Sequence, residues 1–491
     1  MPQLSQILEN LEIIHRQGSE HISIGNIQSD SRLIKKGDLF FARKHRSDGR
    51  EFIHHAIERG AVAVICGPPL VDNLPPHVTL LMVEDPNVAL GIAASNLYGS
   101  PSRALALIGV TGTNGKTTIA TALFRLFRKL GHKAGLLSTI QNQIEDEVVV
   151  STHTTPDVLQ NHNLMRRMVD AGCRYCFMEV SSHGMVQRRI EGLRFAGGIF
   201  TNLTRDHLDY HETFDRYREA KKAFFDYLPS DAFALVNADD PNAEFMLRDC
   251  RARTFHYGIR TPADFRCQVL KSHFDGMRLQ LDGVTMDTGL VGEFNAANLV
   301  AVHGAAILLR QSKNQVLAAI GQLGGIPGRF QSIPTGRGAT AIIDYAHTPD
   351  ALENVLNTID HIRDKNQRII TVVGAGGDRD KTKRPLMGKI AGQWSDMVIL
   401  TADNPRSEDP ARILDHMQQG VETEDRKKVT QILDRREAME TALSLANRGD
   451  IVLVAGKGHE TYQEINGIRH HFDDSEVVRA FSDRETQRGD K

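Results

Sequence analysis

A glycine-rich turn that carries a lysine and two threonines is the part of the chain best suited to chemistry. It follows an apolar run, and the segment reads Leu105-Ala-Leu-Ile-Gly-Val-Thr-Gly-Thr-Asn-Gly-Lys-Thr-Thr118. Glycines let backbone N–H groups face an anion, a lysine supplies a positive charge, and a hydroxyl at a helix start can ligate Mg²⁺. The sequence therefore predicts a phosphate-binding loop formed by Gly112, Thr113, Asn114, Gly115, Lys116, Thr117 and Thr118. The alternative is a plain strand-to-helix turn, because Val110 stands where the common P-loop has its first glycine.

Two further polar clusters follow predicted strands in the same region. One is Met178-Glu-Val-Ser-Ser-His-Gly184, and the other is Thr201-Asn-Leu-Thr-Arg-Asp-His-Leu-Asp-Tyr-His211. Beside a phosphate loop they could form an Mg²⁺ site, with Glu179 as an oxygen ligand and His207 as a less usual nitrogen ligand. Helix capping together with a hydrogen-bonded core histidine would explain either cluster equally well.

Lys221 interrupts an apolar stripe. Apolar residues recur at helical spacing at Phe214, Tyr217, Phe224, Phe225 and Leu228. At about 100° per residue Lys221 falls in the middle of this stripe, while Lys222 points to its side. Burial would favour the neutral, nucleophilic amine. Such an amine can extend to the surface, pair with an acid or react with CO₂ to form a carbamate, and the pattern alone favours extension to the surface.

Three loops in the last third of the chain combine charge with glycine or proline. Gly374-Ala-Gly-Gly-Asp-Arg-Asp-Lys-Thr-Lys-Arg384 suits a carboxylate or a phosphate. Asp403-Asn-Pro-Arg406 could hold the ammonium and the carboxylate of an amino acid at once, and Glu460 in Gly456-Lys-Gly-His-Glu460 could bind a second ammonium. Solvated loops with ordinary capping would explain each loop separately, but not their joint placement at successive strand ends.

Length and patterning predict an α/β protein of three domains. With 491 residues and domains of about 100–200 residues, we expect a small α/β unit over 1–102, a central domain over 103–332 and a third over 333–491. Alternating strands and amphipathic helices indicate a mostly parallel central sheet with helices on both faces and a Rossmann-like third domain. Ligands should gather at the carboxyl ends of the strands.

The amino-acid composition limits the kinds of binding partner that we expect. The 59 basic and 61 acidic residues nearly cancel, so nothing indicates nucleic acid or an anionic membrane as a partner. The start of the chain lacks the pattern of a secretory signal, no apolar run approaches the ~20 residues that span a bilayer, and five cysteines do not indicate a disulfide framework. We expect a monomeric cytoplasmic protein that acts on small molecules.

Taken together, these motifs resemble the Mur ligase family of peptidoglycan synthesis, and the resemblance covers essentially the whole chain. The signatures, in family order, are Gly112–Thr118, Glu179–Gly184, Asn202–His211, Asp344-Tyr-Ala-His-Thr-Pro-Asp350, Gly376–Lys381 and Gly456–Glu460. The resemblance implies an ATP- and Mg²⁺-dependent ligase that adds meso-2,6-diaminopimelate to UDP-N-acetylmuramoyl-L-alanyl-D-glutamate through an acyl phosphate. Lys116 would stabilise the transferring phosphoryl group.

The same resemblance implies roles residue by residue. Thr117 would hold one Mg²⁺, and a second would be bound by Glu179, His207 and a carbamylated Lys221. For Lys221 this differs from the pattern alone, which favours extension of the side chain to the surface. Positions that match contacts with ATP are Asn295, Arg329 and Asp344. Those that match contacts with the UDP-sugar peptide are Ser29, Ser31, His45, His153, Thr154, Thr155, Ser181, Gln187 and Arg189. Diaminopimelate would be bound by Arg379, Asp403, Asn404, Pro405, Arg406, Gly456 and Glu460.

His45-Arg-Ser47 and His153 depart from the pattern expected of relatives. Alternative functions are a lysine-adding member or a folylpolyglutamate synthase, and, from another class, a P-loop switch without ligase chemistry. The Asp-Asn-Pro-Arg loop and the full first domain speak against the first two. A switch would hydrolyse ATP without the other substrates.

Overall fold

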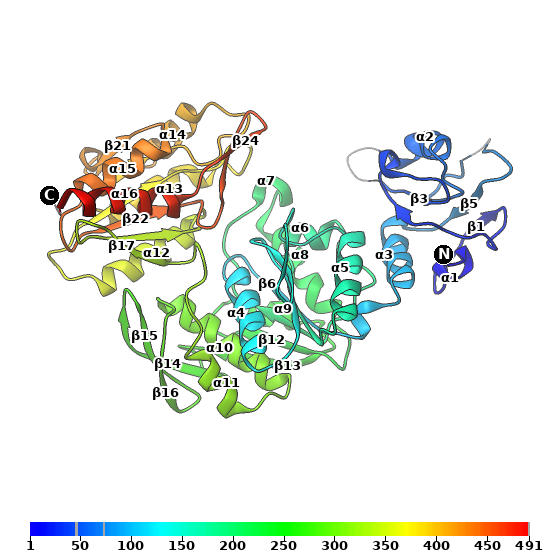
Figure 1. Ribbon diagram of the computed structural model, residues 1–491, viewed down its shortest axis with the longest axis horizontal. Helices are drawn as coiled ribbons and strands as arrows, with labels where there is room; N and C mark the ends of the chain where they lie inside the picture. The colour runs from blue at the N-terminus through cyan, green and yellow to red at the C-terminus, as the bar shows by residue number, and fades with distance from the viewer. Residues whose placement is uncertain (45–47, 72–73, 490–491) are drawn as a thin grey trace.

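The computed structural model describes residues 1–44, 48–71 and 74–489. The chain forms three lobes in sequence order along the long axis of the molecule (Figure 1). The amino-terminal lobe lies at one end, the central lobe follows, and the carboxyl-terminal lobe lies at the other end. Each lobe contains its own sheet. The predicted α/β class with a parallel-rich central sheet is confirmed.

The first lobe is a small sheet with helices on both faces. Its strand order is β1-β5-β4-β3-β2, and only the β1–β5 pairing is antiparallel among its described strands. One core packs α1 and α3 on one face, and a second core packs α2 on the other. The elements are α1 (Leu4–Ile7), β1 (His15–Gln17), β2 (Ile27–Gln28), η1 (Ser31–Leu33), β3 (Leu39–Ala42), η2 (Gly49–Phe52), α2 (Ile53–Glu58), β4 (Ala63–Cys66), β5 (Thr79–Met82) and α3 (Pro86–Leu97).

The central sheet is parallel in its middle and antiparallel at both edges. Its order is β16-β15-β14-β13-β12-β11-β6-β10-β7-β8-β9, with antiparallel pairs from β14 to β16 and from β7 to β9. The elements are η3 (Pro101–Arg103), β6 (Ala106–Thr111), α4 (Lys116–Lys129), β7 (Ala134–Leu137), β8 (Asn142–Ile144), β9 (Glu147–Val149), α5 (Val158–Asp170), β10 (Tyr175–Glu179), α6 (Ser182–Val186), β11 (Gly197–Phe200), α7 (Leu208–His211), α8 (Phe214–Asp226), β12 (Phe233–Asn237), α9 (Ala243–Leu247), β13 (Arg253–Gly258), β14 (Phe265–His273), β15 (Gly276–Leu281), β16 (Val284–Thr288), α10 (Glu293–Leu308) and α11 (Lys313–Ile320).

Strand β6 shows why this sheet is covered on both faces. Its side chains alternate, so that Leu107 enters the core beneath α5 and α8, whereas Ile108 and Val110 enter the core beneath α4 and α10. A strand buried on both sides reads as a continuous apolar run, which is the pattern seen in the sequence. The register pairs Val110 with Glu179, so β6 and β10 end at the same edge of the sheet.

The third lobe repeats this design. Its sheet order is β17-β18-β22-β19-β20-β21; β17 is antiparallel to β18, and the other neighbours are parallel. Helices α12 to α14 cover one face, and α15 and α16 cover the other. The elements are β17 (Gln331–Pro334), β18 (Thr340–Asp344), α12 (Pro349–Ile362), β19 (Ile369–Val373), α13 (Lys383–Trp394), β20 (Met397–Leu400), α14 (Pro410–Gln419), η4 (Arg426–Lys428), β21 (Val429–Gln431), α15 (Arg435–Leu445), β22 (Ile451–Ala455), the hairpin β23 (Tyr462–Ile465) and β24 (Ile468–His471), and α16 (Asp474–Gly489).

The chain passes from the second sheet to the third near the expected boundary at residue 332. That position lies within β17, whose pairing with β18 puts it in the third sheet. We keep the division into 1–102, 103–332 and 333–491 as a proposal, and note that the boundary between the second and third domains cuts β17. Across the part of the chain that the structure describes, no helix is long and apolar enough to span a bilayer.

Candidate active site

A cleft of about 1010 Å³ brings the phosphate loop to the strand ends of the third lobe. The central lobe contributes the loop after β6 and residues after β7, β10 and β11. The third lobe contributes residues after β18, β19, β20 and β22. Polar loops at the carboxyl ends of parallel strands from two lobes therefore face one space, as expected for ligand binding in α/β sheets.

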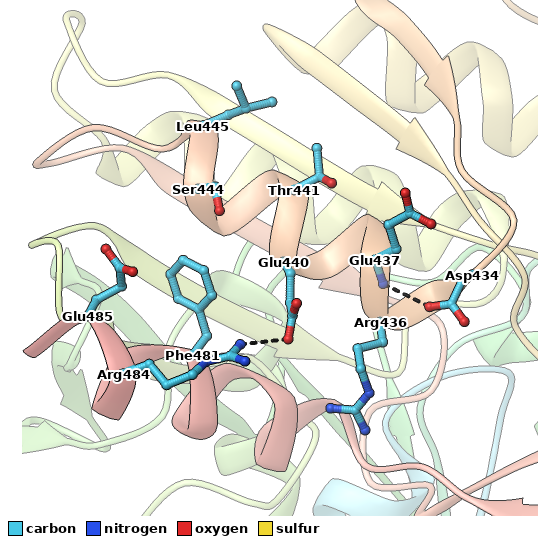
Figure 2. A pocket seen from close by; sticks show the side chains of 10 residues that line it. All are labelled: Asp434, Arg436, Glu437, Glu440, Thr441, Ser444, Leu445, Phe481, Arg484 and Glu485. Atoms are coloured by element: carbon cyan, nitrogen blue, oxygen red, sulfur yellow. Dashed lines mark hydrogen bonds and ion pairs between the residues drawn. The ribbon is translucent and has the colours of Figure 1, made fainter. Parts of the chain in front are cut away.

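A smaller hollow of about 600 Å³ lies on the third lobe between α15 and α16 (Figure 2). It contains an ion pair and a helix cap. Arg484 donates to Glu440 at 2.6 Å, and Asp434 caps α15 by accepting from the backbone N–H of Glu437 at 2.8 Å. None of the predicted site residues lines it. The larger cleft is the candidate active site.

The phosphate loop has the backbone that its glycines predict. Gly112 has φ +144° and Gly115 has φ +88°, and a β-carbon on Gly112 would lie 1.8 Å from the hydroxyl oxygen of Thr201. Only glycine fits that conformation and space. Lys116 Nζ donates to the carbonyl oxygens of Gly112 and Thr113 at 2.8 and 2.7 Å. Its ammonium thus lies over the loop, where a phosphate would be bound.

Glu179 lies next to Thr117 and fits a hard cation. The Thr117 hydroxyl donates to Glu179 Oε2 at 3.0 Å, and the backbone N–H of Thr139 donates to Oε1 at 2.7 Å. The carboxylate is fully buried, and its oxygens and the Thr117 hydroxyl are the ligand types that Mg²⁺ prefers. No group of three or more His, Cys, Asp or Glu among the described residues is arranged to hold a metal by itself.

Lys221 is buried, so the expectation from pattern alone that it extends to the surface is wrong. It is 1 % exposed on α8, and Nζ donates to the carbonyl oxygen of Gly112 at 2.6 Å and lies 4.6 Å from the centre of the Tyr217 ring. Burial, with the nearby charge of Lys116, lowers the pKa of Lys221 well below its usual value. The neutral amine that a carbamate requires is therefore favoured. The structure also differs from the predicted stripe at two positions. Phe214 is exposed, and Lys222 is buried against Asp226 and Asp249.

His207 lies close to this cluster, in a left-handed backbone conformation with φ +55°. Its Nε2 is 3.4 Å from Asp206 Oδ2, and its ring packs edge-on against His183 at 4.8 Å. Burial lowers the pKa of His207 well below its usual value, so the imidazole is neutral and able to act as a ligand. Glu179, His207 and Lys221 all line the cleft.

The positions predicted to contact ATP are divided between the cleft and the core. Arg329 Nη2 donates to Thr117 Oγ1 at 3.2 Å, and its guanidinium lies 4.3 Å over the Tyr345 ring. Asp344 Oδ2 accepts from the backbone N–H of Phe330 at 2.6 Å, and burial raises the pKa of Asp344 to about 6. Asn295 does not line the cleft. It is buried, and it accepts a hydrogen bond from Asn298, which does line the cleft.

The predicted amino-acid loops meet at one end of the cleft. Asn404 Nδ2 donates to Glu460 Oε2 at 2.7 Å, and Arg406 Nη1 donates to the carbonyl oxygen of Gly377 at 2.7 Å. Arg406 is held at φ +52°, a strained conformation for arginine that is typical of functional positions. Six of the seven predicted residues line the cleft, namely Arg379, Asp403, Asn404, Arg406, Gly456 and Glu460; Pro405 lies behind them, buried.

The positions predicted for a UDP-sugar peptide are spread more widely. Four line the cleft: His153, Thr154, Ser181 and Arg189. Thr155 is buried and donates to the carbonyl oxygen of Glu179, and Gln187 accepts from Arg189 at 3.0 Å.

Ser29 and Ser31 lie in the first lobe outside the cleft, with Ser29 accepting from Arg43 and Ser31 bonded to His55. His45 is outside the described residues. The structure therefore brings part of this set to the cleft and leaves the first-lobe residues apart.

Sequence reasoning did not name several residues that the fold brings to the site. Examples are Thr139, Asn298 and Lys457. Asn298 could have been suspected because it lies one helical turn after Asn295, and Lys457 because it stands between two glycines of a predicted loop. Thr139 follows a short strand and carries no local signal of its contact with Glu179.

Comparisons with known proteins agree with this architecture. The chain matches the family models "Mur ligase family, catalytic domain" over residues 23–98, "Mur ligase middle domain" over 110–306 and "Mur ligase, glutamate ligase domain" over 328–458. Among curated proteins it is 53% identical to UDP-N-acetylmuramoyl-L-alanyl-D-glutamate--2,6-diaminopimelate ligase of Parabacteroides distasonis, covering 97% of this chain and 98% of that protein. It is 50% identical to the enzyme of the same name from Bacteroides fragilis, covering 97% and 98%.

Solved structures give the same picture. A structure of UDP-N-acetylmuramoyl-L-alanyl-D-glutamate--2,6-diaminopimelate ligase superposes with a TM-score of 0.68 at 33% identity and covers 99% of both chains. The MurF ligase of Thermotoga maritima in complex with ADP is similar in fold, with a TM-score of 0.63 at 18% identity over 94% of this chain and 98% of that one. By motifs, fold and full-length similarity, the chain belongs to the Mur ligase family.

Proposed function

We propose that the chain is a MurE-type ligase, which uses ATP to add meso-2,6-diaminopimelate to UDP-N-acetylmuramoyl-L-alanyl-D-glutamate. The observation that carries the proposal is the shared cleft, in which the phosphate loop of the central lobe faces the Asp403–Arg406 loop of the third. The similarity to ligases of that name over nearly the whole chain supports the same choice of amino acid.

The proposed reaction has two steps in the cleft. The D-glutamyl γ-carboxylate attacks the γ-phosphorus of ATP, which forms an acyl phosphate and releases ADP. An amine of diaminopimelate then attacks the acyl carbon, loses a proton and displaces phosphate, which leaves an amide. Phosphoryl transfer needs little covalent chemistry from the protein, so the residues act by placing charge and excluding water.

Cations around the loop suit that task. Lys116 and Arg329 would neutralise charge on the transferring phosphoryl group. Mg²⁺ would supply further charge neutralisation when bound. Thr117 would hold one ion, and Glu179, His207 and a carbamylated Lys221 would hold a second. The oxygen atoms of Thr117 and Glu179 and the neutral amine favoured at Lys221 support this assignment.

The third lobe would select the amino acid. Diaminopimelate carries a carboxylate and an ammonium at each end. Arg406 and Arg379 would bind its carboxylates, and Asp403, Asn404, Gly456 and Glu460 its amino groups. Lysine lacks the second carboxylate and would leave a guanidinium without its partner, which is the kind of loss that gives strong discrimination.

The nucleotide and sugar ends of the substrates are assigned by the same proposal. Arg329 and Asp344 would contact ATP directly, and Asn295 would act through Asn298, which donates to it and lines the cleft wall. Thr154, Ser181 and Arg189 would bind the UDP-sugar peptide from the central lobe, and Ser29 and Ser31 from the first. We also propose that the enzyme acts as a cytoplasmic monomer. All five cysteines are free thiols, as is usual in that reducing compartment.

Phosphate release tests this function against a P-loop switch. With ATP and Mg²⁺ present, we expect release only when the UDP-linked dipeptide and diaminopimelate are both added. Release of phosphate at the same rate from ATP alone would contradict the ligase assignment.

A further inference from the structure

We propose that Lys457 is a positioning residue of the amino-acid site. Its buried ammonium balances one of two neighbouring acids, Asp403 and Glu460, so that the pocket offers a single net negative charge to the ammonium of the incoming amino acid. The inference rests on the proposed function, because it assumes that these acids receive an amino-acid substrate.

The geometry places one lysine between the two acids. Lys457 follows β22, and its side chain is 0 % exposed. Its Nζ lies 3.2 Å from Glu460 Oε2 and 3.6 Å from Asp403 Oδ1. A lysine held entirely out of water needs paired charge, and here the only acids within 4 Å among the described residues are these two.

Lys457 also fixes the orientation of Asn404. Nζ donates to Asn404 Oδ1 at 3.3 Å, and the backbone N–H of Glu464 donates to the same oxygen at 2.9 Å. The amide nitrogen is thereby turned toward Glu460 Oε2, 2.7 Å away. One ammonium group therefore orders three side chains that face the cleft.

The charges of Asp403, Glu460 and Lys457 determine the net charge of the pocket. Asp403 and Glu460 contribute two negative charges and Lys457 one positive charge. Arg435 lies behind them, but its guanidinium is paired with Asp474 at 2.7 Å, both side chains are fully buried, and the pair is neutral as a whole. One negative charge remains for a ligand. Other titratable or charged groups around the acids are Tyr345, Arg406, His459, Tyr462 and Glu464.

One buried acceptor in this pocket has the Lys457 ammonium at 3.6 Å but no hydrogen-bond donor among the described residues. Asp403 Oδ1 is buried and receives no hydrogen bond from the described residues. A buried carboxylate oxygen left in this way is costly unless something else binds it. Since Asp403 lines the cleft, an ammonium group of the substrate would satisfy it.

Without Lys457 the two acids would face each other unbalanced. Burial and the charge of Asp403 already raise the pKa of Glu460, and Lys457 and Asn404 oppose that rise. Removing the lysine would raise this pKa further and favour a proton on Glu460. A protonated acid binds an ammonium poorly. Affinity for diaminopimelate should then improve as pH rises and the proton leaves.

The test compares Lys457→Met, which keeps length and removes charge, with the matched control Lys389→Met. Lys389 is exposed on α13 in the same lobe and pairs with Glu422. In Lys457→Met the KM for diaminopimelate should rise roughly 30-fold at about pH 7 and fall as pH is raised toward about 9, with the KM for ATP unchanged. The wild type and Lys389→Met should show the same, nearly flat KM over this range.

A KM for diaminopimelate within about twofold of the wild type would overturn the proposal. So would equal increases in both KM values without pH dependence, because that is the result of a merely structural role. If the wild type shows no turnover that depends on diaminopimelate, the proposed function fails instead, and the two failures are distinct.

A double variant keeps the test decisive if Lys457→Met does not fold. Lys457→Met/Glu460→Gln restores the charge count, since Asp403 alone remains. It should fold and show a KM for diaminopimelate that is raised but independent of pH over the same range. Failure of the double variant to recover either folding or a flat pH profile would contradict the balance of charge.

Discussion

At the scale of single residues, Lys221 shows how burial changes chemistry. Its amine lies against the Gly112 carbonyl oxygen and the Tyr217 ring, away from water. We predict that Lys221→Ala lowers kcat about 10²- to 10³-fold, because a metal-binding anion is lost. Bicarbonate should not restore activity, whereas a small carboxylate such as formate should do so in part. Lys222→Ala, which loses only ion pairs with Asp226 and Asp249, should keep its kcat. Turnover by Lys221→Ala at the normal rate without an added carboxylate would show that the enzyme does not need a carbamate at Lys221.

Asp344 makes a prediction about pH and stability. Burial raises its pKa to about 6 in the folded protein, above the ~4 of an unfolded chain. Between these values the folded state holds a proton that the unfolded state has lost. The contribution is therefore fully present below about pH 4 and is lost as pH rises through about 6, by up to about 3 kcal/mol.

Asp344→Asn has no such proton to lose. Urea unfolding of both proteins at about pH 4.5 and about pH 7 should show the variant gaining stability relative to the wild type as pH rises. A difference that stays constant between the two pH values would show that Asp344 is ionised throughout.

At the scale of elements, two loops of the third lobe are fitted closely together. The backbone N–H of Gly377 donates to the Asn404 carbonyl oxygen at 2.9 Å, and a β-carbon on Gly377 would lie 1.9 Å from the carbonyl oxygen of Pro405. We predict that Gly377→Ala separates these loops and raises the KM for diaminopimelate roughly tenfold, with little change in the KM for ATP. The control is Gly325→Ala, where nothing lies within 4 Å of the added carbon. Matching kinetics for the two variants would mean that the loops adjust without cost.

The same elements show what the sequence can predict. The strands β6, β19 and β22 can be predicted because a strand buried on both faces appears in the sequence as a continuous apolar run. The start of α14 was equally clear, since Asp409 caps it and Pro410 occupies its first turn.

Contacts across the fold could not be predicted in this way. The depth of Lys221 depends on how α8 packs, which a helical wheel does not contain, and so its extension to the surface was wrongly favoured. Asn295 is predicted to contact ATP, and the sequence does not show that its side chain donates to the Val291 carbonyl oxygen in the core and that the neighbouring Asn298 lines the cleft. Thr139 contacts Glu179, which is far away in sequence. Lys457 stands between two glycines of a loop and contacts Asp403, which is also distant in sequence. The hydrophobic pattern predicts the strands and the loops that follow them. The distances between those loops are known only from the folded structure.

At the scale of the whole molecule, a buried ion pair links the central and third lobes. Lys383 Nζ at the start of α13 lies 3.8 Å from Asp206 Oδ1, and His347 Nε2 lies 4.0 Å from Asp206 Oδ2. Lys383→Met would leave the Asp206 charge with less compensation and weaken the contact between lobes. We predict a larger radius of gyration in small-angle X-ray scattering and a lower kcat. Lys389→Met, on the same helix but exposed, should change neither. An unchanged radius in Lys383→Met would show that other contacts, such as that of Asn114 with Asp350 at 3.0 Å, hold the lobes together.

The central claim is that one cleft joins a phosphate loop to a site for an amino acid with two carboxylates. The most direct measurement is amide product formation from the UDP-linked dipeptide and ATP, with meso-diaminopimelate or L-lysine as the amine. The account predicts a kcat/KM for diaminopimelate higher by about 10³-fold or more, because lysine leaves an arginine of the site unpaired. Equal values for the two amines, or a preference for lysine, would contradict it.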